Sequence, residues 1–135
     1  MVEVQPINLT VVHDSRGLLS AIQYPGQLPF VPLRAFIITK SPVGTERGGH
    51  AHRTCHQLLI ATAGSVAVQY DDDLGTNDRV LFAGNHGLHI PPLAWATQRY
   101  LSPDASLLVL ASHAYDVDDY VDDREEARGL RNATG

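Results

Sequence analysis

Short runs rich in β-branched and aromatic residues alternate along this chain with clusters of turn residues. In Ser65–Tyr70, Val66, Val68 and Tyr70 alternate with small or polar residues, as in a strand with one buried face. Similar runs predict strands at Asn8–His13, Leu18–Tyr24, Leu33–Thr39, Gln57–Ala61, Ser65–Tyr70, Arg79–Phe82, Leu88–Ile90, Ala94–Tyr100 and Ser106–Ser112. Many short strands at this spacing favour an all-β sandwich or barrel.

The segment Val117–Leu130 has a different composition, because acidic residues are followed by a mixed run of acids and arginines. Glu125 and Arg128 would face each other three residues apart on a helix, which favours a short terminal helix. A solvated helix or a frayed end is the alternative interpretation, so the tail is expected to be helical or irregular.

Composition narrows the class of protein. The 135 residues fit one domain spanning 1–135, and 44% of them are hydrophobic, as in an ordinary globular protein. The net charge of −5 argues against a nucleic-acid partner, and no apolar run approaches the roughly 20 residues of a membrane span. Cys55 is the only cysteine and is expected to be a small buried residue. A reducing compartment is therefore expected, and with an N-terminus unlike a signal peptide this indicates the cytoplasm.

Two histidines stand two residues apart in the run Arg47-Gly48-Gly49-His50-Ala51-His52-Arg53. Alternate residues of a strand point to the same side, so His50 and His52 are expected to project together. Such a pair suits metal binding or proton transfer, because imidazole titrates near neutral pH. Taken alone, the pattern fits an ordinary surface or core strand equally well.

The surrounding spacing resembles the first motif of the cupin superfamily, with Gly44, His50, His52, Gln57 and Gly64 in place. Metal-binding cupins carry glutamate at the position of Gln57. The stretch Pro91–Ala96 resembles the second motif, with Ala96 where a histidine ligand would stand. A tight divalent site needs three or four ligands, so these two departures favour a pocket without metal. His56, His86 or His89 could replace a missing ligand in a different arrangement.

A closer resemblance is to the nucleotide-sugar 3,4-ketoisomerases, and it runs from about residue 8 to residue 126. The segments that carry it are Asp14–Gly17, Pro29-Phe30, Arg34, Arg47–Arg53, Gln57–Leu59, Gly64–Val66, Gly87–Pro92, Trp95, Val109–Ser112, Tyr115-Asp116 and Asp118–Tyr120. The resemblance implies a homodimeric jelly-roll cupin of amino- or deoxy-sugar biosynthesis that works without metal or other cofactor. Its usual substrate is the nucleotide sugar dTDP-4-keto-6-deoxyglucose, which it converts to a 3-keto isomer through an enediolate.

The resemblance also implies roles for particular residues. His50 is expected to be the base at C3, and His52 a second proton carrier or an oxyanion donor. Arg47 or Arg99 would bind the diphosphate, although a surface arginine is often merely solvated. Gln57 could orient an imidazole. The residues Trp95, His89 and Phe36 would face the base or the sugar, with core packing as the alternative for Trp95 and Phe36.

One departure from the ketoisomerases concerns the acid. Related sequences often carry tyrosine in the strand after Arg34, whereas this chain has Phe36. Either the histidines then do all the proton transfer, or a water takes part. Three other functions stay open: a nucleotide-sugar epimerase, a noncatalytic sugar-nucleotide-binding cupin, and a metal-dependent cupin oxygenase.

Overall fold

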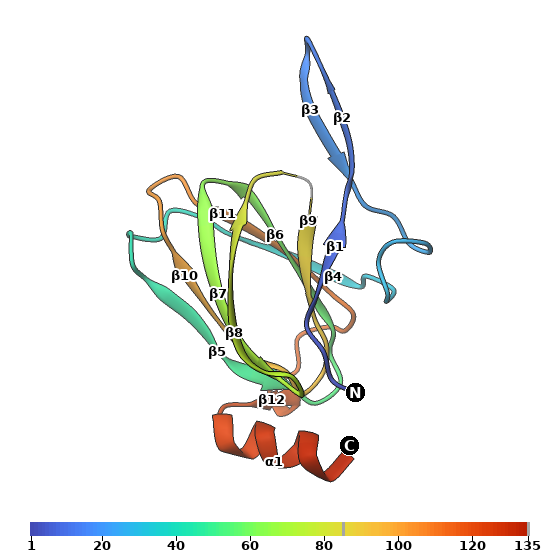
Figure 1. Ribbon diagram of the computed structural model, residues 1–135, viewed down its shortest axis with the longest axis vertical. Coiled ribbons are helices and arrows are strands. Elements are labelled where there is room, and N and C mark those ends of the chain that lie inside the picture. The colour runs from blue at the N-terminus through green and yellow to red at the C-terminus, as the bar shows by residue number, and fades with distance from the viewer. Residues whose placement is uncertain (85, 135) are drawn as a thin grey trace.

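The computed structural model describes residues 1–84 and 86–134, and most of them form antiparallel strands in two facing sheets (Figure 1). The first sheet has the order β1-β9-β6-β11-β4, the second has the order β12-β5-β10-β7-β8, and β2 and β3 form a separate hairpin. The strands are β1 (Gln5–Asn8), β2 (Thr10–Asp14), β3 (Gly17–Ala21), β4 (Arg34–Ile38), β5 (Glu46–His52), β6 (Gln57–Ala63), β7 (Ser65–Asp72), β8 (Gly75–Phe82), β9 (His86–Ile90), β10 (Trp95–Tyr100), β11 (Ser106–Ala111) and β12 (Tyr120–Val121).

The main core lies between the two sheets. Val66 and Val68 are fully buried there with Tyr70, as the alternation in Ser65–Tyr70 predicts. The facing sheet contributes alternate side chains of β6 and β11, including Leu59 and Leu107. Burial of each such apolar side chain stabilises the folded state, and the alternation of side chains along a strand determines which residues are buried. The prediction of an all-β jelly-roll fold with a short C-terminal helical or irregular tail is confirmed, and the tail is helical.

The strand boundaries differ from the sequence predictions where pairing overrides composition. The run Asn8–His13 is divided, since β1 pairs with β9 in the first sheet and β2 pairs with β3 in the hairpin. Strand β8 begins at Gly75, four residues before the predicted run, because it pairs with β7 along its whole length. Strands β5 and β12 lie outside the predicted runs and form one edge of the second sheet.

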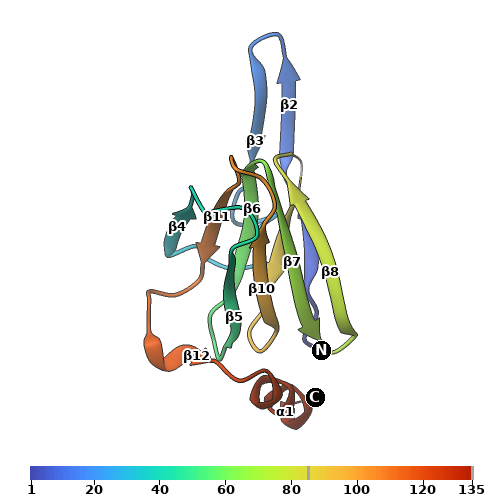
Figure 2. The ribbon, with the colours of Figure 1, turned by 90° about the vertical axis from the view of Figure 1, so that its left-hand side faces the viewer.

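The C-terminal segment closes one end of the two sheets (Figure 2). A 3-10 turn, η1 (Val117–Asp119), leads into β12, and α1 (Arg124–Thr134) follows. Ala127 of α1 is buried against Ala51, Trp95 and Val121. The predicted helix is therefore present, with Arg128 Nη1 3.0 Å from Glu125 Oε1, and the frayed end is wrong, although most side chains of the helix are exposed to solvent. No helix within residues 1–84 and 86–134 has the length and apolar character needed to cross a bilayer.

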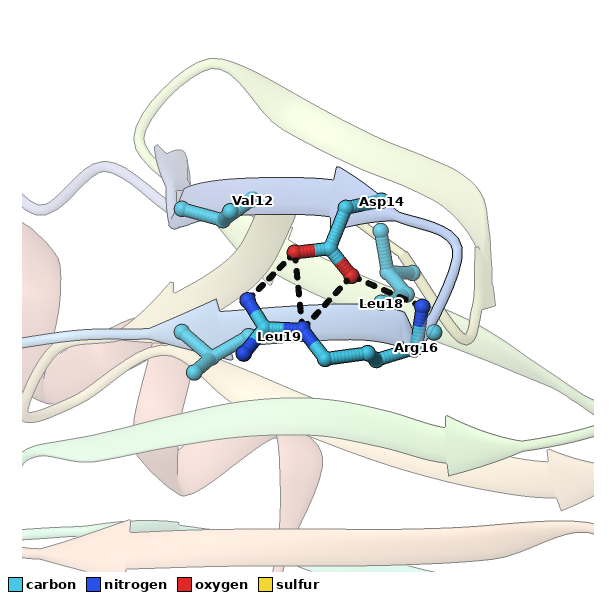
Figure 3. Close-up of a pocket in the computed structure, with 6 residues that line it drawn as sticks. Val12, Asp14, Arg16, Leu18 and Leu19 are labelled. Atoms are coloured by element: carbon cyan, nitrogen blue, oxygen red, sulfur yellow. Dashed lines mark hydrogen bonds and ion pairs between the residues drawn. The ribbon is translucent and has the colours of Figure 1, made fainter.

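The β2–β3 hairpin projects beyond both sheets (Figures 1 and 2). Its apolar side chains are exposed, among them Val12 at 51% and Leu19 at 58%. At its tip, the Arg16 guanidinium donates to both carboxylate oxygens of Asp14, from Nε to Oδ1 and Oδ2 and from Nη2 to Oδ2 (Figure 3). The hairpin therefore has apolar surface that the described residues leave uncovered. Because an isolated two-stranded hairpin is only marginally stable in water, this surface favours packing against another chain.

Candidate active site

The two histidines of the motif lie side by side on the inner face of β5. Their ring centroids are 5.0 Å apart, and the rings meet at 89°. His52 is buried, and His50 is half-buried. This confirms the prediction from the sequence that the two rings project to the same side of the strand.

A β-bulge in β5 brings Arg47 to the same face as His50. Residues three apart in a regular strand point to opposite faces. Here Ala96 of β10 pairs with His50 while Thr97 pairs with Gly48, so Gly49 is an extra residue. Gly48 and Gly49 have φ values of 84° and 75°, a region that favours glycine. The double glycine is thus the local reason why an arginine and a histidine share one wall.

A cavity of about 150 Å³ opens beside this wall, between the two sheets. Four residues singled out in the sequence line it together: Phe36 from β4, Arg47 and His50 from β5, and Gln57 from β6. The other lining residues are Ile38, Gly48, Leu59, Gln98, Val109 and Tyr120. The wall is therefore apolar on the β4 and β11 side and polar on the β5 side, which suits a ligand with one reacting face.

Two other predicted residues lie on the outer face of the second sheet. Trp95 packs against Ala51 and the C-terminal segment, in a small buried cluster, as the alternative of core packing predicted. Arg99 is exposed, with its Nε 3.9 Å from Glu46 Oε1. The structure does not bring either side chain to the cavity, because their positions in β10 alternate with those of Ala96 and Gln98.

His89 lies on the outer face of the first sheet. Its ring stacks on His56 with centroids 5.2 Å apart, and its Nε2 is 3.0 Å from His56 Nδ1. Phe30 covers both rings. Burial, together with the neighbouring His56, lowers the pKa of His89 to about 4. This second histidine pair is therefore separate from the cavity.

Tyr120 was not among the predicted site residues, yet its ring contacts both histidines. The ring centroid of Tyr120 is 4.7 Å from that of His50 and 4.5 Å from that of His52. It lines the cavity from β12, which pairs Tyr120 with His52. The only signal in the sequence was the Asp118–Tyr120 segment of the family resemblance. A phenol is thus present although β4 carries Phe36.

Asp119, the neighbour of Tyr120, holds His52 from the other side. Its Oδ2 is 3.1 Å from His52 Nδ1 and accepts from the Cys55 backbone N–H. Its Oδ1 accepts from the backbone N–H and the hydroxyl of Thr54. Burial acts to raise the pKa of the Asp119 carboxyl, but these hydrogen bonds outweigh it and keep the pKa below its usual value. The group is therefore a carboxylate at neutral pH.

Both histidines of the site are neutral at neutral pH. Burial lowers the pKa of His50, against weaker opposing effects of the Asp122 charge and the Gly48 backbone. Burial and then His50 lower the pKa of His52 to about 4, although Asp119 acts to raise it. Neutral imidazoles can accept protons, which is the property that a general base needs.

Arg34 supplies a positive charge inside the barrel. Its Cζ lies 5.1 Å from the Phe36 ring centroid and 5.8 Å from that of Tyr115. Its Nε is buried and has no hydrogen-bond partner among the described residues. A buried donor without a partner is costly, so this group is suited to an anionic ligand. The sequence showed Arg34 only as part of the family resemblance.

A metal ion has two conceivable sets of ligands here. His50 faces Gln57 and Ala96, which add one neutral amide and no further ligand. His52, Cys55 and Asp119 have ligand atoms within 4.8 Å of one another. The Asp119 carboxylate in that second set already accepts four hydrogen bonds, which a metal would have to displace. The donor chemistry of both sets is therefore poor for a tight site.

Comparison with known proteins gives consistent relatives. Residues 2–131 match the family described as FdtA: WxcM-like, C-terminal. A TDP-4-oxo-6-deoxy-alpha-D-glucose-3,4-oxoisomerase from Aneurinibacillus thermoaerophilus is 34% identical over 119 residues, which cover 88% of this chain and 86% of that protein.

Solved structures agree with this assignment. A double mutant of the QdtA 3,4-ketoisomerase from Thermoanaerobacterium thermosaccharolyticum, in complex with TDP, is similar with a TM-score of 0.91 and 31% identity, covering 97% of this chain and 95% of that one. The WlaRB TDP-quinovose 3,4-ketoisomerase from Campylobacter jejuni has a TM-score of 0.85 and 31% identity, covering 92% and 95%. The chain therefore belongs to the FdtA (WxcM-like, C-terminal) family, a nucleotide-sugar 3,4-ketoisomerase family with the cupin fold.

Proposed function

We propose that this protein is a dTDP-4-keto-6-deoxyglucose 3,4-ketoisomerase that produces a dTDP-3-keto-6-deoxyhexose. The observation that carries the proposal is the cavity in which neutral His50 and the Arg47 guanidinium share one wall. A base and a cation at one wall suit a substrate that has an acidic C–H bond near a diphosphate. Family membership supplies the class of substrate.

The first step is removal of the proton at C3. That C–H bond lies next to the C4 ketone, so its electron pair forms a C3=C4 double bond while the carbonyl pair moves to O4. His50 is the proposed base, since it lines the cavity and its depressed pKa keeps it neutral. A positioned acid or base contributes roughly 100- to 10,000-fold to such a step.

The second step reverses this sequence one carbon along the ring. O3 loses its proton, the C3=O bond forms, and C4 receives a proton on carbon while O4 ends as a hydroxyl. Hydrogen is moved within the substrate, so no external oxidant or reductant is needed. His52 and Tyr120 are the proposed partners for these transfers, because their rings contact that of His50.

Charge on the enediolate oxygens needs donors that are already in place. Arg34 is the proposed donor, because its Nε is buried beside the cavity residue Phe36 and has no partner among the described residues. Arg47 is favoured over Arg99 as the ligand of the diphosphate, since Arg47 lines the cavity and Arg99 faces outward. Gln57 and Phe36 would contact the sugar from the opposite sheet.

A homodimer in the cytoplasm, serving deoxy- or amino-sugar biosynthesis, completes the proposal. A groove of about 300 Å³ runs between the hairpin and the first sheet, and Leu18, Ile60 and Leu108 contribute to its lining. A second copy of the chain would cover this apolar surface. Light scattering is expected to give a dimer mass that Leu18→Asp reduces, because Leu18 lines the groove, while Leu74→Asp at the exposed β7–β8 turn leaves it unchanged. A monomeric wild-type protein would contradict the dimer.

Incubation with dTDP-4-keto-6-deoxyglucose in D2O tests the activity. NMR spectroscopy of the product is expected to show a ketone at C3 and deuterium on the ring. His50→Asn should abolish both, because asparagine cannot take up the proton. A product that keeps its C4 ketone and has an inverted ring carbon would instead indicate an epimerase. Binding of TDP without any exchange would indicate a noncatalytic protein.

A further inference from the structure

The Asp119 carboxylate is saturated with hydrogen-bond donors. Its side chain is only 10% exposed, and it accepts from His52, from Cys55 and twice from Thr54. Three of these donors come from the turn that follows β5, so the carboxylate is fixed to the same piece of backbone that carries His52. This arrangement leaves the carboxylate little freedom to rotate away from the imidazole.

The position of the His52 proton follows from this contact. An ionised carboxylate only accepts hydrogen bonds, so the nitrogen 3.1 Å away, Nδ1, must carry hydrogen. A neutral imidazole has one N–H, which leaves Nε2 with a free lone pair. The Nε2 atom is buried and has no hydrogen-bond partner within residues 1–84 and 86–134. It lies on the inner face of β5, the face that also carries His50.

We infer that Asp119 is a positioning residue, which holds His52 with hydrogen on Nδ1 and keeps Nε2 bare as a proton acceptor. The inference rests on the proposed function for its catalytic meaning. It distinguishes between the two roles that the family resemblance leaves open for His52. A bare Nε2 takes up a proton and cannot donate a hydrogen bond to an oxyanion. Once Nε2 is protonated, the carboxylate stabilises the imidazolium.

The surrounding charges explain why such a carboxylate is needed. Burial, His50 and Arg34 all disfavour the charged form of His52, while Asp119 alone among the groups acting on it favours that form. Without Asp119, protonated His52 would be an isolated cation beside a guanidinium in a poorly solvated site. The carboxylate therefore orients the ring and also makes proton uptake energetically accessible.

Nitrogen-15 NMR of histidine-labelled protein tests the assignment without substrate. In the wild type, the His52 signals, identified by their loss in His52→Gln, are expected to show hydrogen on Nδ1 and a bare Nε2. Hydrogen on Nε2 in the wild type would overturn the inference. Because this measurement needs neither a variant of Asp119 nor turnover, it decides the inference even if the proposed reaction fails.

Asp119→Asn tests the consequence for catalysis. Asparagine keeps the size of the side chain but removes its charge, so kcat is expected to fall about 10- to 100-fold, with little change in KM for the substrate or in binding of TDP. Asp71→Asn is the matched control, since Asp71 is also a buried carboxylate that anchors the C-terminal segment, through Arg124. The control should lose stability and keep kcat. Equal losses of kcat in both variants, or none in Asp119→Asn, would refute the positioning role.

Discussion

The β-bulge at Gly48 predicts a large and specific effect of one methyl group. In Gly48→Ala, the new Cβ would lie 2.8 Å from Gln98 Oε1 and 2.9 Å from the Ala96 carbonyl oxygen. The Gln98 side chain can move, but the Ala96 carbonyl belongs to the backbone of β10, which is paired on both sides. The strain must therefore be absorbed by β5, the strand that carries Arg47 and His50.

The magnitude has two contributions. Alanine at φ +84° costs roughly 1–2 kcal/mol because its Cβ crowds the following carbonyl. Overpacking against fixed backbone costs roughly a further 1–3 kcal/mol. We expect the free energy of unfolding to fall by about 2–5 kcal/mol, and affinity for TDP to fall because Arg47 moves relative to His50.

Urea denaturation and calorimetric titration with TDP measure these two effects. Gly129→Ala is the matched control, because a Cβ at Gly129 in α1 meets open space. There the substitution is expected to raise the free energy of unfolding by about 0.5–1 kcal/mol. A Gly48→Ala protein with the stability and TDP affinity of the wild type would show that the bulge does not set the geometry of the site.

Two further predictions concern protons. Tyr120→Phe keeps the ring contacts with His50 and His52 but removes the phenol, so kcat is expected to fall at least about 10-fold while stability changes little; unchanged turnover would exclude the phenol from the reaction. His52 and His89 have pKa values of about 4 when folded and near 6.5 when unfolded, so their contribution to stability is complete above pH 6.5 and is lost as the pH falls toward 4. Each group should change the free energy of unfolding by up to about 1.4 kcal/mol per pH unit in that window, and His89→Phe should flatten the dependence measured by urea denaturation at pH 7, 6 and 5. An equally steep dependence in the variant would contradict the buried neutral state of His89.

The sequence predicted those features that depend on neighbours along the chain. Alternation within Ser65–Tyr70 identifies a half-buried strand, because the period of two is a property of the strand itself. The same period places His50 and His52 on one side. The spacing of glycines and histidines carried only the resemblance to the cupin superfamily. The ordered set of motifs from Asp14–Gly17 to Asp118–Tyr120 carried the closer resemblance to the ketoisomerases, and the comparisons confirm that family.

The choice between inner and outer face depended on the tertiary structure. Alternation shows that Trp95 and Arg99 share a side of β10, but not whether that side faces the cavity or the solvent. Pairing of Ala96 with His50 settles the question by turning Ala96 inward, which leaves Trp95 to pack under α1. His89 is a similar case, because the outer face of the first sheet is also partly buried, by Phe30.

By itself, the sequence determined most of the strands and the joint projection of His50 and His52, because these follow from local periodicity. Its ordered motifs carried the family resemblance. Only the tertiary structure decided that Asp119 and Tyr120 contact His52, 67 residues away from Asp119 in the chain. Their segment is acidic and has the composition of a solvated tail. Its place at the site depends on pairing of β12 with β5 and on burial of Ala127. The free energy of such long-range contacts depends on both partners together, so neither segment's sequence alone predicts it.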